Sequence, residues 1–139
     1  GAVIMAKYSG YNADFDIGEL SFDGGILRVA GLKAELGTAL RAQIRARDVS
    51  LMLDQPKGTS VLNVFRGEII ELREEKGPQL DLLIDIGIPL IARITKKSFS
   101  DLDLSLGSQV YALVKAVAID HRALGAARPL SRKTKFETP

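Results

Sequence analysis

The sequence contains no cysteine and no tryptophan among its 139 residues, and its single histidine is His121. The absence of cysteine excludes disulfides and thiolate metal sites, and one histidine leaves little capacity for soft-metal chemistry. Aromatic residues make up 6% of the chain, which argues against a stacking surface for single strands or sugars. No apolar run approaches the roughly 20 residues that a membrane-spanning helix needs. These absences predict a soluble protein without a metal site, and they fit a reducing cytosol.

Charged residues of both signs are mixed along most of the chain, and the net charge is only +2. Basic residues are concentrated only in residues 121–139, which we predict to be a loosely ordered tail. This distribution does not predict nucleic-acid binding. The carboxylates are dispersed and no serine nucleophile motif is recognisable. We therefore predict no catalytic residue, and no enzyme activity for this chain by itself.

Short apolar runs separated by Gly, Pro, Asn and Asp predict an all-β fold. Residues 23–25, Asp-Gly-Gly, lie between two such runs and predict a hairpin, because glycine reaches positive φ without steric cost. The even-numbered residues from 80 to 86 are all apolar, whereas residues 81 and 85 are aspartates, and this alternation predicts a strand with one buried face. Residues 90–95 are predicted to be its partner strand.

One segment, residues 96–104, departs from the strand pattern. Ser98 and Asp101 have the spacing of a capping box, which predicts a single short helix. Two strands followed by a short helix and a further strand are typical of a five-stranded OB-type barrel. The predicted fold class is therefore all-β, with one or two small OB-like barrels and one short helix.

An internal repeat relates the two halves of the sequence. Residues 36–46 match residues 106–116 in residue type at most positions, at a spacing of 70 residues. Each copy begins with Leu-Gly and carries a basic residue at the same place, Arg45 or Lys115. The repeat predicts two related barrels, or one barrel and a degenerate second one. The predicted segments are 1–54 (first half), 55–120 (second barrel) and 121–139 (tail).

Residues 54–58, Asp-Gln-Pro-Lys-Gly, form the predicted linker between the halves, since proline removes a backbone donor and glycine frees the backbone. Just before it, the odd-numbered residues change character. Residues 41, 43, 45 and 47 are polar or charged, whereas residues 49, 51 and 53 are apolar. A β-bulge near Arg47 and Asp48 would re-aim the side chains in this way.

Lys115 interrupts a predicted strand face that is otherwise apolar, formed by Tyr111, Leu113, Val117 and Ile119. A buried ammonium group needs a counter-charge, because desolvating it alone costs several kcal/mol. An anion would supply that charge. Two interpretations remain open: Lys115 binds an anion, or it reaches solvent or a carboxylate at the rim of the barrel.

A second candidate site lies in residues 58–63, at the entrance to a predicted strand. The hydroxyls of Thr59 and Ser60, the amide of Asn63 and consecutive backbone N–H groups suit a tetrahedral oxyanion, whose hydration shell must be replaced donor by donor. The alternative interpretation is an ST-turn that closes the loop before the strand.

Four segments follow one another in the order seen in a known family: residues 44–51, 58–64, 90–95 and 110–118. In this succession the chain resembles the C-terminal portion of the ATPases of bacterial molybdate ABC importers, which is the TOBE or Mop-type domain. The likeness covers nearly the whole chain except the tail. The order of all four segments is much more specific than any one of them.

The resemblance implies an OB-like barrel that binds molybdate or tungstate in the related proteins, usually at subunit interfaces and often with strands exchanged between chains. It implies a homodimer, an ATPase domain in the same full-length chain, and an indirect association with the membrane subunits at the cytoplasmic face. In some members bound oxyanion restrains transport. An unpaired barrel edge gives a physical reason for dimerisation, because open N–H and C=O groups accept a strand from a symmetry mate.

The family's binding motifs are only partly present. The Ser-Ala-Arg-Asn motif of the small molybdate-binding proteins corresponds to residues 60–63, with Leu62 in place of arginine, and their later Lys-Ser pair corresponds to Lys115 and Ala116. Each missing charge-assisted bond is worth about 1.5–3 kcal/mol, so its loss weakens binding by about tenfold or more. The candidate oxyanion-binding residues are Thr59, Ser60, Asn63 and Lys115.

Three functions remain open after the sequence. The first is a regulatory domain that binds molybdate or tungstate and pairs the subunits of an importer ATPase, with no other cofactor. The second is a purely structural dimerisation domain that has lost its anion. The third is a stand-alone molybdate-storage protein built from two repeats.

Overall fold

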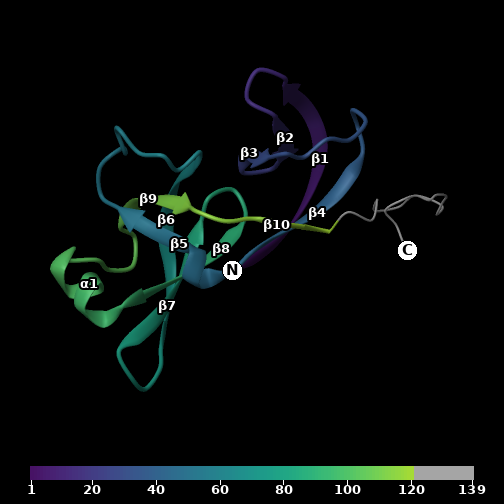
Figure 1. Ribbon diagram of the computed structural model, residues 1–139. Helices are drawn as coiled ribbons and strands as arrows, with labels where there is room; N and C mark the ends of the chain where they lie inside the picture. Colours follow the sequence, from purple (N-terminus) through teal and green to yellow (C-terminus); the bar gives the residue numbers. More distant parts are fainter. Residues whose placement is uncertain (121–139) are drawn as a thin grey trace. The chain divides into compact units, whose positions relative to one another are not determined.

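The computed structural model describes residues 1–120, which form two compact units built almost entirely of β-strands (Figure 1). Of the described residues, unit 1 contains 1–2, 23–25 and 44–117, and unit 2 contains 3–22, 26–43 and 118–120. The all-β prediction is confirmed. The basic tail predicted at residues 121–139 lies outside the described residues.

The described residues form ten strands, one α-helix and one turn of 3-10 helix. The strands are β1 Ala2–Asn12, β2 Ile17–Phe22, β3 Gly25–Ala30, β4 Ala39–Ile44, β5 Val49–Met52, β6 Asn63–Glu74, β7 Gln79–Asp85, β8 Pro89–Thr95, β9 Gln109–Val114 and β10 Ala118–Asp120. The α-helix is α1 Lys96–Asp101, and the 3-10 turn is η1 Ala46–Asp48. Within residues 1–120, no helix combines the length and the apolar character needed to cross a membrane.

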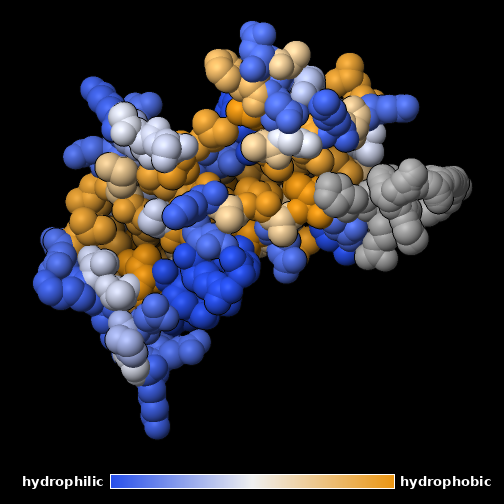
Figure 2. Space-filling view, in the orientation of Figure 1, coloured by the Kyte–Doolittle hydropathy of each residue, from blue (hydrophilic) through white to orange (hydrophobic). Residues whose placement is uncertain are grey.

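Unit 1 is a five-stranded antiparallel sheet with the order β5-β9-β6-β7-β8. Strand β5 also contacts β8, so the sheet curls back on itself as an OB-like barrel does. The predicted alternation in β7 is confirmed, because Leu80, Leu82 and Ile84 are buried. The tip of the β6–β7 hairpin, by contrast, is hydrophilic (Figure 2).

Unit 2 is a second five-stranded sheet, with the order β10-β4-β1-β2-β3. Leu20, Leu27 and Leu40 are buried in its core. The hydroxyl of Tyr8, which is also buried, donates a hydrogen bond of 2.8 Å to the carbonyl oxygen of Leu32. The hairpin predicted at residues 23–25 is confirmed, because β2 ends and its neighbour β3 begins there.

The two copies of the internal repeat have the same backbone geometry at their Leu-Gly turns. Gly37 and Gly107 both have φ of 88°, a left-handed value that favours glycine. The N–H of Gly37 donates to Tyr8 O, and the N–H of Gly107 donates to Ile69 O, both at 2.8 Å. In return, the N–H of Tyr8 donates to Thr38 O at 2.9 Å, and the N–H of Ile69 donates to Ser108 O at 3.0 Å. The turns of unit 1 and unit 2 are therefore equivalent.

The same strand residues mark an irregularity in both units. The pairing of β1 with β2 shifts register between Tyr8 and Gly10, and the pairing of β6 with β7 shifts between Ile69 and Glu71. Such a bulge bends a strand and increases its twist, as a small curled sheet requires. Strand β6 thus corresponds to β1, and the repeat extends well beyond the Leu-Gly turns.

One edge strand of each sheet comes from the other repeat of the sequence. Strand β5 follows β4 in the chain but pairs with β9, and β10 follows β9 but pairs with β4. The compact units consequently part between Gln43 and Ile44, before the boundary at residues 54 and 55 that we predicted. The β-bulge predicted near Arg47 and Asp48 is wrong, since a turn of 3-10 helix occupies this place and redirects the chain.

The short helix predicted within residues 96–104 is confirmed as α1, but its cap differs from the prediction. Thr95 is the N-cap residue: its backbone is extended, and its Oγ1 accepts a hydrogen bond of 2.9 Å from the N–H of Ser98. Ser98 lies inside the first helical turn, where its N–H is one of the groups that need a cap. The helix therefore begins one residue after strand β8 ends.

Candidate functional site

Lys115 lies at the end of strand β9, outside the sheet. Strand β9 ends at Val114 and β10 begins at Ala118, so the single apolar strand that we predicted from Tyr111 to Ile119 is wrong. The Lys115 side chain is exposed. Its backbone N–H donates to Asp48 O at 2.9 Å, which holds residue 115 beside the start of β5. The lysine therefore reaches solvent in this chain, which is the second of the two interpretations that its sequence position left open.

Asp48 connects Lys115 to a second basic residue, Arg45. Arg45 Nε donates to Asp48 Oδ2 at 2.9 Å, and the side chains of Arg45 and Asp48 are 58% and 19% exposed. The carbonyl oxygen of Asp48 accepts the bond from Lys115. Because β5 pairs with β9, the two equivalent basic positions of the repeat meet at one end of unit 1. Sequence analysis found their equivalence but missed their proximity, since nothing in the sequence signals that the strands are exchanged.

Asn63 is the first residue of β6 and lies directly opposite Val114, the residue before Lys115. Directly opposed residues of antiparallel strands point to the same face. Val114 is 1% exposed and Asn63 is 6% exposed, so the asparagine side chain belongs to the interior of the barrel. Asn63 also has an interaction partner in the structure. The register therefore brings the backbone of Asn63 close to Lys115, while its amide faces inward.

Thr59 and Ser60 lie in the loop that leads into β6, and both are exposed. Thr59 Oγ1 accepts a hydrogen bond of 3.1 Å from the N–H of Val61. This contact is an ST-turn, as the alternative interpretation of the segment predicted. The Thr59 hydroxyl still has its proton to donate. Within residues 1–120, no hydrogen bond joins Thr59 or Ser60 to Lys115.

Some charged side chains of unit 1 have close partners. Arg93 donates to both carboxylate oxygens of Asp81, at 2.8 and 3.1 Å, and this lowers the pKa of the Asp81 carboxyl group. Lys97 Nζ lies 2.7 Å from Asp101 Oδ1 on helix α1. The Lys115 ammonium group has no carboxylate partner within residues 1–120, and the same is true of other exposed basic residues of unit 1 such as Arg66. The described part of the chain also lacks a group of three or more metal-ligating side chains.

Comparison with known proteins identifies one matching domain family. Residues 59–120 match the TOBE domain. This range begins at Thr59 and contains all four candidate oxyanion-binding residues.

Curated relatives match nearly the whole chain. It is 37% identical over 131 residues to the molybdenum import ATP-binding protein ModC of Mesorhizobium japonicum, covering 94% of this chain and 35% of that protein. It is 38% identical over 122 residues to the protein of the same name from Rhizobium meliloti, covering 87% of this chain and 34% of that protein. The chain thus spans about a third of the length of these relatives.

A solved structure shares the fold. The cytoplasmic molybdate-binding protein ModG, in a crystal form with molybdate bound, superposes with a TM-score of 0.71 at 20% sequence identity. The match covers 85% of this chain and 94% of that one. At this identity the likeness establishes the architecture of the chain.

Proposed function

We propose that this chain, whose residues 59–120 match the TOBE domain, is the oxyanion-binding and regulatory part of a molybdenum-importer ATP-binding protein. The observation that carries the proposal is the similarity to two such proteins over most of the chain. ATP hydrolysis then belongs to a domain outside this chain. The full protein acts at the cytoplasmic face of the membrane, where it associates with the importer's membrane subunits.

The proposed ligand is molybdate or tungstate, and the proposed site is the end of unit 1 around Lys115. The ammonium group is exposed and lacks a carboxylate partner within residues 1–120, and a tetrahedral dianion would supply the missing charge. The exposed hydroxyls of Thr59 and Ser60 are the neutral donors of the proposed site. Asn63 stays the fourth candidate through its place at the start of β6, but its amide faces the interior and would have to turn outward to reach the anion. Because Lys115 is exposed in one chain, we place the bound anion at a homodimer interface that excludes water from it.

The proposed regulation follows from thermodynamic linkage between anion binding and the arrangement of the subunits. An oxyanion at the interface of two chains stabilises the arrangement of subunits that binds it more tightly. It changes the activity of attached ATPase domains only to the extent that its affinity differs between two arrangements. A site that lies at a dimer interface provides such a difference, because its donors come together only when the chains pair.

Replacing Lys115 by alanine is expected to weaken molybdate binding by about tenfold or more, because a charge-assisted bond to the anion is lost. Isothermal titration of the chain with sodium molybdate measures the change in dissociation constant. Lys97→Ala is the matched control, because Lys97 is an exposed lysine of the same unit whose ammonium group pairs with Asp101. This control variant should bind molybdate as the unsubstituted chain does.

A Lys115→Ala variant with unchanged affinity would contradict the proposed site. The absence of a heat signal with both molybdate and sulfate would instead support the second candidate function, a structural dimerisation domain without an anion. Leu62 and Ala116 favour this alternative, because they replace two donors of the related molybdate-binding motifs. Sedimentation velocity with and without molybdate would separate dimerisation from ligand binding.

Asp48→Asn is expected to tighten molybdate binding by about two- to fivefold. The Asp48 carboxylate pairs with Arg45, and the backbone carbonyl of the same residue accepts from the N–H of Lys115, so this residue brings a negative charge to the end of unit 1 that holds the proposed site. Removing one exposed or partly exposed charge changes an interaction by about 0.2–1 kcal/mol. Asparagine keeps an acceptor for Arg45, so the fold is retained. The same titration, repeated at high and low salt, checks the result, since weaker binding by the variant would contradict the location of the site.

A further inference from the structure

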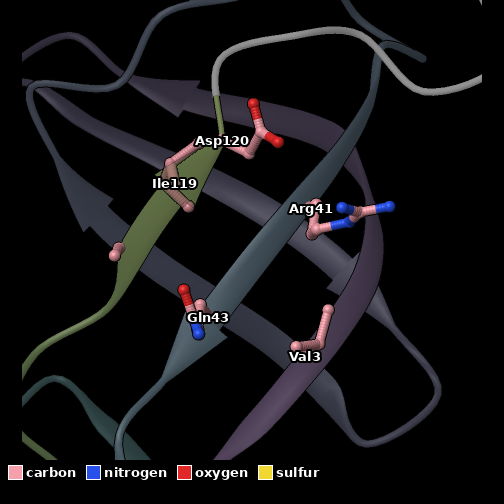
Figure 3. Close-up of a pocket in the computed structure, with 6 residues that line it drawn as sticks. Val3, Arg41, Gln43, Ile119 and Asp120 are labelled. Carbon is pink, nitrogen blue, oxygen red and sulfur yellow. The ribbon is translucent and has the colours of Figure 1, made fainter.

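Unit 2 has a hollow of about 300 Å³ on the face of strand β4. Figure 3 shows Arg41 and Gln43 along β4, with Ile119 and Asp120 on the neighbouring strand β10 and Val3 on β1. Ala118 completes the lining. None of these residues belongs to the candidate site around Lys115, which lies in unit 1.

Arg41 brings an unsatisfied donor to this hollow. Its Nε atom is buried and has no hydrogen-bond partner within the described residues. A buried N–H without an acceptor is costly and uncommon in folded proteins. The Gln43 side chain, two residues further along the same strand, is exposed and adds an amide donor on the same face. The hollow therefore offers donors to a ligand that carries acceptor oxygens.

The remaining lining residues restrict the charge and shape of this ligand. Asp120 lies directly opposite Arg41 in the pairing of β10 with β4, so the charges of the lining nearly cancel. The Asp120 carboxylate, the one acidic group among the described lining residues, disfavours a dianion such as molybdate much more than a monoanion. Val3 on β1 and Ile119 on β10 are apolar lining residues on the two sides of β4, and a bare tetrahedral oxyanion would leave them without a contact (Figure 3). An organic monocarboxylate matches the hydrogen-bond donors, the nearly neutral charge and the apolar residues of the lining.

We propose that the hollow on β4 is a binding site for a small aliphatic monocarboxylate, separate from the oxyanion site of unit 1. On binding, the Arg41 side chain turns its buried Nε toward the ligand carboxylate, which also accepts from the Gln43 amide, since guanidinium and carboxylate groups have complementary geometry. The aliphatic part of the ligand packs against Val3 and Ile119. The site thus gives the domain a ligand class other than inorganic oxyanions.

Titration of the ¹⁵N-labelled chain with sodium butyrate, followed by amide chemical shifts, tests the proposal. Saturable shifts are expected at residues 3, 41–43 and 118–120. The neutral isostere butyramide should bind about tenfold more weakly or worse, because it lacks the charge that Arg41 recognises. Molybdate should leave these amides unchanged.

Two variants keep the test decisive. Arg41→Gln should weaken butyrate binding by about tenfold or more, and Asp120→Asn should tighten it by about two- to fivefold. Arg66→Gln, which removes an exposed arginine from β6 of unit 1, is the matched control and should bind butyrate normally. Equal shifts with butyrate and butyramide, no saturable shift, or an Asp120→Asn variant that binds more weakly would each overturn the proposal.

Discussion

Replacing Gly18 by alanine is expected to lower the free energy of unfolding of unit 2 by about 2–4 kcal/mol. A Cβ atom at this position would overlap the carbonyl oxygen of Leu32 and lie 3.0 Å from Tyr8 Cε1. The same carbonyl accepts the buried hydrogen bond from the Tyr8 hydroxyl, at 2.8 Å. Relief of the overlap must move backbone rather than a flexible side chain, so the substitution strains the core and weakens this bond together.

Gly10→Ala is the matched control for this substitution. Its Cβ atom would meet Glu19 Oε1 at 3.0 Å, and that atom is the end of a flexible side chain that can move away. A change of no more than about 0.5 kcal/mol is expected. Urea denaturation measures both variants, and amide hydrogen exchange over β1 to β4 shows whether unit 2 is the part that loses protection. Equal losses in the two variants would mean that the contact with Leu32 does not limit stability.

Leu82→Ala is expected to destabilise unit 1 by about 2–5 kcal/mol, as truncations of fully buried leucines do. Leu82 is 0% exposed and lies on β7, opposite Leu72 on one side and Ala92 on the other. Ala92 is itself fully buried and too small to fill the space. The lost side chain would therefore leave a cavity in addition to the lost transfer energy.

The control for Leu82 is Leu106, which is 60% exposed in the turn before β9. Leu106→Ala should change the free energy of unfolding by no more than about 0.5 kcal/mol. Urea denaturation gives the free energies, and hydrogen exchange over β6, β7 and β8 shows where protection falls. A small effect at Leu82 would indicate that the barrel collapses around the cavity, which would contradict the tight packing inferred from its burial.

Local patterns were sufficient for several elements of this fold. Alternation over residues 80–86 predicts β7, because side chains of a strand point alternately to core and solvent. The Leu-Gly repeat predicts equivalent turns at Gly37 and Gly107, because glycine adopts a left-handed conformation easily. The short helix follows from the interruption of that alternation.

Patterns failed where the chain leaves one sheet and enters another. The odd-numbered residues from 111 to 119 have the alternation of a single strand in the sequence, yet β9 and β10 lie in different sheets. Residues 115–117 connect them without strand pairing, and the strands on the two sides have different neighbours: Val114 pairs with β5 and β6, whereas Ile119 pairs with β4. Periodicity reports which face of a strand is covered but does not report which strand covers it.

The candidate site shows the same division. The residue types of Thr59, Ser60 and Lys115 suggested oxyanion chemistry from the sequence, and the ST-turn at Thr59 was among the alternatives that it left open. Only the structure showed that Lys115 is exposed, that Asn63 is buried and that Asp48 lies between Arg45 and Lys115. Burial and charge pairing depend on residues far apart in the chain, so a local pattern does not contain them.

The sequence by itself determined that this chain is a duplicated all-β protein with one short helix, because strand alternation, glycine turns and repeats are encoded by neighbouring residues. Only the tertiary structure decided that each repeat completes its sheet with a strand from the other, and that the hollow at Arg41 forms on β4. These features arise from hydrogen bonds between β-strands distant in sequence, and their free energy depends on the whole fold.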